Sequence, residues 1–117
     1  MKPNNPELIK VTRLLKSKST ELHTPIWNAL AERLESSKHN RCAVNVSRIN
    51  RYSVDGDVVT VPGKVLGVGT LDHKVSIAAF MFSKVATRKI EAAGGKCLTF
   101  SDLVRNNPTG SNLKIIG

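Results

Sequence analysis

The chain has 117 residues, 40% of them hydrophobic, which is enough for one core of ordinary size and excludes a wholly disordered chain. Eighteen Lys and Arg against nine Asp and Glu leave a net charge of +9. Such an excess repels itself, and a polyanion relieves it most directly, so nucleic acid is the leading expected partner.

Targeting and membrane segments are not expected. The first six residues are polar and contain two prolines, and the longest apolar run, Ile77 to Phe82, has only six residues. We therefore expect a cytoplasmic protein with no membrane association, whose Cys42 and Cys97 remain thiols in a reducing compartment.

Two amphipathic helices are predicted at the start of the chain. The first covers Pro6 to Lys16, with apolar residues at helical spacing at Leu8, Val11, Leu14 and Leu15. The second has Thr24 as its N-cap and Pro25 at its first helical position, and its apolar side carries Ile26, Trp27, Leu30 and Leu34.

Short strands are predicted next. Residues 43–51 fit no single pattern and stay unassigned. Val58 to Val61 reads as a strand closed by Pro62-Gly63, and Lys64 to Leu66 reads as the beginning of another. Val75 to Phe82 is predicted as a longer strand, and its almost continuous apolarity predicts burial on both faces.

The second half of the chain predicts two more helices, with a strand between them. The third helix is capped by Ser83 and ends at Gly94-Gly95; its inner stripe is Val85, Ala86, Ile90 and Ala93, and its outer face carries Lys84, Arg88 and Lys89. The fourth starts at a capping box of Thr99 and Asp102. Leu113 to Ile116 is predicted to return as a terminal strand.

Enzyme chemistry is poorly supported. His23, His39 and His73 stand in polar surroundings and are expected on the surface. His39 with Cys42 supplies only half of a zinc site, and there is no CxxC pair. We therefore predict no catalysis, no metal and no cofactor.

The glycine-rich stretch 62–69 keeps an alternative open. It superficially resembles a phosphate-binding loop but lacks the Lys-Ser/Thr pair that a P-loop carries after its last glycine. Gly63, Gly67 and Gly69 more simply allow positive φ or close backbone approach. The alternative function is a small nucleotide- or anion-binding enzyme using the glycine turns around Lys64.

A basic segment favours RNA. Residues 36–54 contain no acid, and they carry Lys38, Arg41, Arg48 and Arg51 among asparagines. Arginine forks bind phosphates and asparagines can contact sugars and bases. Because Trp27, Phe80 and Phe82 lie on core-like patterns, we expect recognition of backbone and shape with little base stacking.

Three motifs in order resemble a known family. They are Val44-Asn45-Val46-Ser47-Arg48-Ile49, then Val61-Pro62-Gly63-Lys64-Val65-Leu66-Gly67-Val68-Gly69, and Ala78-Ala79-Phe80 leading to Phe82-Ser83 and Ala93-Gly94-Gly95-Lys96. The chain resembles the archaeal and eukaryotic large-subunit ribosomal protein eighteen-e family, which is related to the C-terminal domain of bacterial ribosomal protein fifteen. The archaeal form is the closer likeness.

The resemblance implies an α/β fold, an irregular superhelix of short strands and helices preceded by two N-terminal helices. It also implies a single ribosomal RNA-binding domain over residues 1–117, with 1–6 as a flexible N-terminal arm. The expected partners are large-subunit ribosomal RNA, which the protein would clamp, and neighbouring large-subunit ribosomal proteins. No small-molecule substrate is implied.

The predicted RNA contacts combine the charge argument with the motifs. The basic segment supplies Lys38, Arg41 and Arg51; the matched motifs supply Asn45, Ser47, Arg48, Lys64, Ser83, Lys89, Gly94 and Gly95; and the outer face of the third helix adds Lys84 and Arg88. Which of Thr87, Arg88 and Lys89 meets phosphate stays open.

Overall fold

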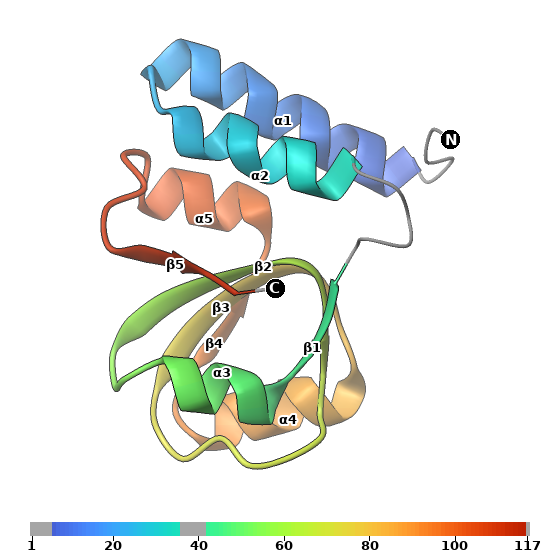
Figure 1. Ribbon diagram of the computed structural model, residues 1–117, viewed down its shortest axis with the longest axis vertical. Helices are drawn as coiled ribbons and strands as arrows, with labels where there is room; N and C mark the ends of the chain where they lie inside the picture. The colour runs from blue at the N-terminus through green and yellow to red at the C-terminus, as the bar shows by residue number, and fades with distance from the viewer. Residues whose placement is uncertain (1–5, 36–41, 117) are drawn as a thin grey trace.

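A helical hairpin opens the chain in the computed structural model, which describes residues 6–35 and 42–116 (Figure 1). Helix α1 covers Pro6–Leu22 and helix α2 covers Pro25–Glu35. His23 takes a left-handed conformation with φ 52° between them, and an ion pair of 2.8 Å joins Lys16 to Glu35 across the hairpin. Helix α2 begins at Pro25 as predicted, but the hydroxyl of Thr24, the predicted N-cap, donates to the Leu22 carbonyl at 3.1 Å. Helix α1 continues six residues beyond the predicted end at Lys16.

Within residues 42–116, the sheet has only parallel strand pairs. Its order is β1 (Cys42–Asn45), β2 (Asp57–Leu66), β3 (Val75–Phe82), β4 (Lys96–Leu98), and β5 (Leu113–Ile115) pairs with β2. The long strand β2 shares one edge between two partners: β5 pairs with its first half and β1 with its second half.

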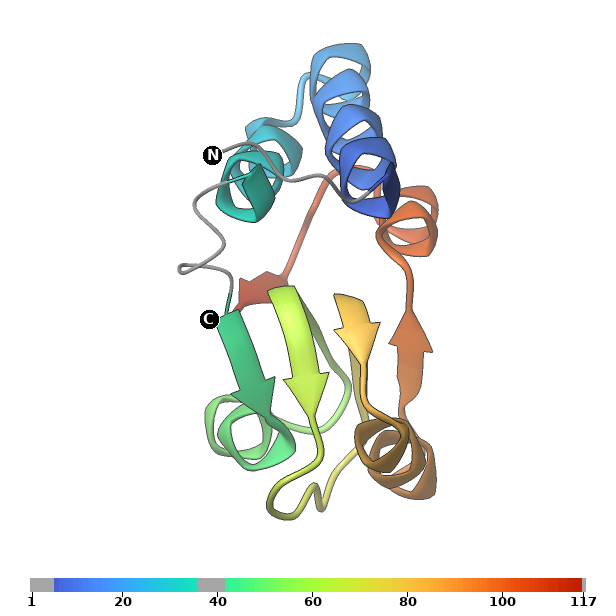
Figure 2. The ribbon, with the colours of Figure 1, turned by 90° about the vertical axis from the view of Figure 1, so that its right-hand side faces the viewer.

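Helices cover the sheet from two directions, as Figure 2 shows: α1, α2 and α5 (Phe100–Asn106) lie together at one end, and α3 (Val46–Tyr52) and α4 (Lys84–Ala92) at the other. Two hydrophobic clusters match this division. One joins the sheet to α3 and α4 and includes Ile49, Ile77 and Ile90. The other joins it to α1, α2 and α5 and includes Trp27 and Phe100.

Local sequence signals account for most element boundaries. The Ser83 hydroxyl accepts a hydrogen bond from the Ala86 amide and begins α4. Thr99 and Asp102 form both halves of a capping box at the start of α5. These predictions and the predicted terminal strand are confirmed.

The largest correction concerns β2, which is one continuous strand rather than two. Pro62-Gly63 does not end it, because the pairing with β3 shifts register between Val61 and Lys64. Val61 pairs with Ala79 and Lys64 with Met81, so two residues of β2 oppose the single residue Phe80 of β3. This β-bulge accommodates the proline, which has no amide proton for the ladder.

Two burial predictions are also wrong. Met81 is 51% exposed, so β3 is not buried on both faces along its whole length, and Val85 in α4 is 46% exposed. The unassigned stretch 43–51 divides into β1 and α3, a helix of seven residues in which Val46 and Ile49 are buried. The α/β class is confirmed, while the irregular superhelix and the domain limits with an arm over 1–6 stay predictions.

Candidate nucleic-acid interface

The carboxyl ends of β1, β2 and β3 meet at one edge of the sheet, which we call the carboxyl edge. Asn45 pairs with Leu66, and Val65 pairs with Phe82, so the three strands finish side by side. Helix α3 follows β1 directly, α4 follows β3 after Ser83, and residues 67–69 leave β2 at the same place. In open parallel sheets, ligands bind at this edge.

The segment Gly67-Val68-Gly69 is held between the two helices. The Ser47 amide donates to the Val68 carbonyl at 3.2 Å. The Lys89 ammonium donates to the carbonyls of Gly67 and Gly69 at 2.6 and 2.5 Å. These carbonyl groups face protein donors, so the segment is organised around a cation and makes no cradle for a phosphate.

The same glycines permit close packing. A Cβ on Gly67 would lie 2.5 Å from Cγ1 of Val85, and a Cβ on Gly69, at φ 96°, would lie 2.3 Å from Cβ of Ser47. Both glycines are therefore explained by contacts inside the protein. The geometry gives no support to the alternative nucleotide- or anion-binding enzyme.

Several predicted contact residues have structural tasks. Ser83 caps α4, and its amide donates to Val65 at 2.9 Å. Gly94 ends α4 in a left-handed conformation with φ 86°. A Cβ on Gly95 would lie 2.1 Å from the Val75 carbonyl oxygen, so only glycine fits there. Direct contact of these residues with RNA stays a prediction.

Lys89 departs from its expected orientation. Because its ammonium reaches the carbonyls of Gly67 and Gly69, it is half-buried, and the prediction that it faces outward is wrong. Its neighbour Arg88 is exposed, and Thr87 donates from its hydroxyl to the Ser83 carbonyl at 3.1 Å. Of these three residues, Arg88 is the one free to meet a phosphate.

In the described part of the chain, five exposed cations stand on the elements that reach the carboxyl edge. They are Arg48 and Arg51 on α3, Lys64 on β2, and Lys84 and Arg88 on α4. Among the described residues, none of them forms an ion pair with a carboxylate. Arg48 lies 6.0 Å above the ring of Tyr52, close enough for a cation–π interaction.

Two polar groups complete the described part of this edge. The Oδ1 atom of Asn45 is buried and accepts no hydrogen bond from the described residues. Ser47 is half-buried beside Gly69. Lys38 and Arg41, also predicted to contact RNA, lie outside the described residues.

The comparisons with known proteins agree with the motif series. The sequence model of the family described as ribosomal protein 60S L18 and 50S L18e matches residues 3–117. The chain is 52% identical, over 96% of its length and 93% of the relative, to a protein named large ribosomal subunit protein eL18 from Methanothermobacter thermautotrophicus. The chain belongs to this family of large-subunit ribosomal proteins.

Two further eL18 relatives support the assignment. The protein of Methanoregula boonei is 47% identical over 96% of this chain and 93% of the relative. That of Methanococcus maripaludis is 46% identical over 97% of this chain and 92% of the relative. The predicted resemblance is thereby confirmed, and with it the predictions of a non-enzymatic, cytoplasmic large-subunit component.

One side-chain arrangement in this ribosomal protein looks like a hydrolase triad. His73 lies 2.9 Å from Asp72 Oδ1 and 2.8 Å from Ser53 Oγ. The Ser53 hydroxyl, however, is buried and donates to the Ile49 carbonyl at 2.5 Å. Its proton therefore serves the end of α3, so the hydroxyl does not donate to His73 as the nucleophile of a triad must.

The same arrangement corrects one surface prediction. The side chain of His73 is only 17% exposed, because it ties the loop before β3 to the end of α3. The hydrogen bond from His73 is the main reason why the pKa of Asp72 lies below its ordinary value. His23 is exposed as predicted, and His39 lies outside the described residues.

Metal and membrane features give no further candidate. The described residues contain no group of three metal-ligating side chains, and no described helix is long and apolar enough to cross a membrane. Cys97 is a free cysteine, and its burial raises the pKa of its thiol.

Sequence reasoning missed two apolar residues at the carboxyl edge of this ribosomal protein. Val68 is 66% exposed and Val85 is 46% exposed. The signal was present for Val68, because an apolar residue between two glycines in a turn has no strand or helix face to bury it. Both residues lie among the exposed cations, so the edge combines charge with apolar contact area.

Proposed function

We propose that this ribosomal protein binds large-subunit ribosomal RNA through the carboxyl edge and clamps RNA segments against each other. The single observation that carries the proposal is the set of five exposed cations on α3, β2 and α4 without carboxylate partners among the described residues. Such cations gain free energy by neutralising phosphates and releasing counterions.

The support for a clamp is mechanical as well as electrostatic. The cations stand on elements that are fixed to one another by the carbonyls of residues 67–69, the Lys89 ammonium and the Ser47 amide. A rigid support sets the distances between bound phosphates, so two RNA segments that bind the same edge must adopt one relative position. Neighbouring large-subunit ribosomal proteins are the further partners that we propose.

Within this function, we assign direct phosphate contact first to Arg48, Arg51, Lys64, Lys84 and Arg88. Asn45 and Ser47 are assigned contact with sugar or base edges, since both lie at the start of α3 beside these cations. Lys38 and Arg41 stay in the proposal on the charge of their sequence segment alone.

The proposal is tested by the salt dependence of RNA binding. The dissociation constant for large-subunit ribosomal RNA is measured over a salt series for the wild type, for Arg48→Ala with Arg51→Ala, and for Lys84→Ala with Arg88→Ala. Each double variant should bind more weakly, and the slope of log K against log salt should fall by about one unit for each lost phosphate contact.

A matched control has the same change in net charge elsewhere. Lys18 pairs with Glu21 at 3.1 Å and Arg105 with Asp102 at 3.5 Å, so Lys18→Ala with Arg105→Ala removes two cations that already have carboxylate partners. The control should keep the wild-type slope. Equal losses in the control and in the edge variants would show that only net charge matters and would contradict the proposal.

A further inference from the structure

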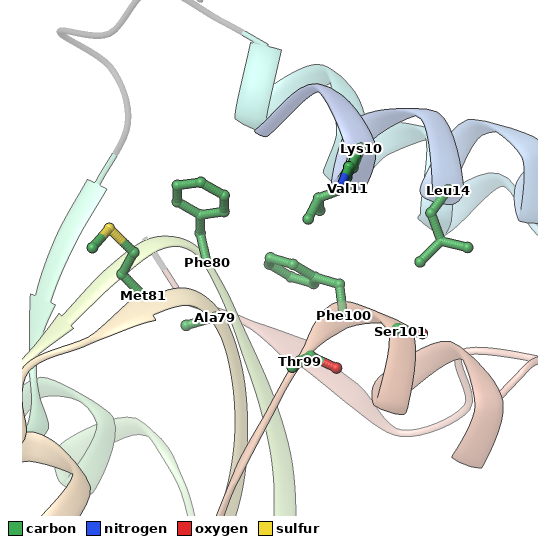
Figure 3. A pocket seen from close by; sticks show the side chains of 9 residues that line it. All are labelled: Lys10, Val11, Leu14, Ala79, Phe80, Met81, Thr99, Phe100 and Ser101. Carbon is green, nitrogen blue, oxygen red and sulfur yellow. The ribbon is translucent and has the colours of Figure 1, made fainter. Parts of the chain in front are cut away.

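A groove opens between α1, the end of β3 and the start of α5, away from the helices of the carboxyl edge (Figure 3). It has a volume of about 470 Å³ and is lined by Val11, Leu14, Phe80 and Phe100 among others. Phe100 is buried, whereas Phe80 is half-buried. The groove therefore offers an aromatic ring that the protein itself does not fully cover.

The β-bulge explains why Phe80 is left partly open. Phe80 is the one residue of β3 opposite Pro62 and Gly63 of β2, where the ladder is irregular. It packs against the helical cluster of α1, α2 and α5, while the next residue, Met81, is 51% exposed at the groove. The sequence predicts Phe80 in the core, because the apolar pattern of the strand does not reveal the bulge in its pairing with β2.

The surroundings of the groove are cationic. Lys10 lines it from α1 and is exposed, and among the side chains that the structure describes no carboxylate pairs with it. Lys64 is the register partner of Met81 on the neighbouring strand, so a second exposed cation stands beside the groove. Of the described side chains that line the groove, none is Asp or Glu. Lys64 is also one of the five exposed cations assigned to phosphate contact.

We propose that this groove holds one unpaired nucleotide of the bound ribosomal RNA, with its base against Phe80 and its phosphates near Lys10 and Lys64. The inference rests on the proposed function and adds a base-binding site to it. Bases stack on aromatic side chains, and their backbone carries the negative charge that these lysines complement. The volume is within the usual range of small-ligand pockets, about 300–1,000 Å³.

An apolar segment of a neighbouring protein is the competing occupant. It would fill the space between Val11, Leu14 and Phe80, but it would use neither Lys10 nor Lys64. A nucleotide uses both the ring and the cations. The Thr99 and Ser101 hydroxyls at the start of α5 add polar groups to the lining, which suit the edge of a base.

The first test compares two phenylalanines of the same strand. Binding of a fluorescein-labelled uridine heptamer is followed by anisotropy for the wild type, Phe80→Leu and Phe82→Leu. Both rings are half-buried, but Phe82 packs against the cluster of α3 and α4 and does not line the groove. Thermal melting confirms that both variants fold.

Phe80→Leu should raise the dissociation constant about tenfold with an unchanged salt slope, because stacking is lost and no charge is removed. Phe82→Leu should bind like the wild type, and Lys10→Ala should lower the salt slope by about one unit. Equal affinity of Phe80→Leu and the wild type, or equal losses in both phenylalanine variants, would overturn the inference.

The second test identifies the occupant in the assembled particle. The chain has two methionines, Met1 and Met81, and Met81 lines the groove. Protein labelled with a diazirine analogue of methionine is assembled into large subunits and irradiated, and the Met81 peptide is examined by mass spectrometry. A nucleotide adduct is expected. An adduct with a protein segment, or no adduct at Met81, would overturn the inference.

The two proposals can fail separately. Suppose that the edge variants at Arg48, Arg51, Lys84 and Arg88 lose affinity for ribosomal RNA. If Phe80→Leu then binds the heptamer like the wild type and Met81 forms no nucleotide adduct, only the base site is wrong. If the edge variants bind as tightly as the wild type, the proposed function itself is wrong.

Discussion

The ammonium group of Lys89, on α4, lies 2.6 Å from the carbonyl oxygen of Gly67, just after β2. The same ammonium reaches the carbonyl of Gly69 at 2.5 Å, so one side chain holds both ends of the segment Gly67-Val68-Gly69 that follows β2. The sequence predicts that Lys89 contacts RNA, but in the structure its charge stabilises the segment 67–69 and so ties α4 to the end of β2.

Replacing Lys89 by methionine should lower the stability of the protein. Lys89→Met keeps the straight apolar stem but removes the donor of two charge-assisted hydrogen bonds, at an expected cost of about 1 to 2 kcal/mol. Urea unfolding measures this change in free energy. Lys84→Met, at an exposed position of the same helix, is the control and should change stability by less than about 0.5 kcal/mol. Equal effects would refute the structural role of Lys89.

Two adjacent glycines should respond differently to alanine. At Gly94 the nearest atom to an added Cβ is Lys74 Cδ at 3.8 Å, so Gly94→Ala costs only the strain of φ 86°, about 1 to 2 kcal/mol. At Gly95 the added Cβ would lie 2.1 Å from the Val75 carbonyl oxygen, so backbone must move and the cost should be larger. Thermal melting of both variants tests this, and Gly95→Ala should have the lower melting temperature.

Gly56→Ala is the matched control for backbone strain. Gly56 has φ 89° and nothing within 4 Å of an added Cβ, so it should lose about as much stability as Gly94→Ala. If Gly95→Ala and Gly56→Ala have the same melting temperature, the close contact between Gly95 and the Val75 carbonyl adds nothing to the cost of the substitution.

Capped and amphipathic elements could be predicted from the sequence because their signals are local. The Thr99–Asp102 box and the Ser83 cap depend on residues within one turn, and both form as the spacing indicates. The long amphipathic pattern that begins at Leu8 predicts α1 for the same reason, although the helix continues into a polar stretch after Lys16. That stretch contains an ion pair of 3.1 Å between Lys18 and Glu21, at the i,i+3 spacing that stabilises a helix.

Features that depend on distant residues could not be predicted. The sequence cannot show that Pro62-Gly63 sits in a bulge, since the register of β2 is fixed by its pairing with β3. Nor can it show that Lys89 finds carbonyl acceptors 22 and 20 residues earlier in the chain. The exposed cations of the carboxyl edge were predictable because charged side chains face water by default.

Ser53 should be inert toward serine-reactive reagents, in spite of its distance of 2.8 Å from His73. Ser53 is 7% exposed and its hydroxyl donates to the Ile49 carbonyl, so a fluorophosphonate should not label it in the folded protein. Mass spectrometry of the intact chain detects the adduct. Stoichiometric labelling that depends on His73 would reopen the enzymatic interpretation, whereas Ser53→Ala should only lower stability, by about 1 to 3 kcal/mol.

The carboxylate of Asp57 should make the stability of the protein depend on pH. It accepts hydrogen bonds from Lys114 Nζ at 2.7 Å and from the Val54 amide at 2.8 Å, and the bond from Lys114 is the main reason why its pKa lies below the ordinary value of 3.8. Because the pKa is lower in the folded state, the contribution to stability is complete above the unfolded value and disappears as the pH falls through the folded value.

Asp57→Asn should therefore destabilise the protein by about 1 kcal/mol at neutral pH, where the wild-type carboxylate is charged. The difference between wild type and variant should shrink as the pH falls below 3.8, because the unfolded wild-type chain then takes up a proton that the folded carboxylate, with its lower pKa, does not yet bind. Urea unfolding of both proteins at neutral pH and at about pH 3 tests this. A difference that stays constant over this range would show that the charge of Asp57 contributes nothing and that only the shape of the side chain matters.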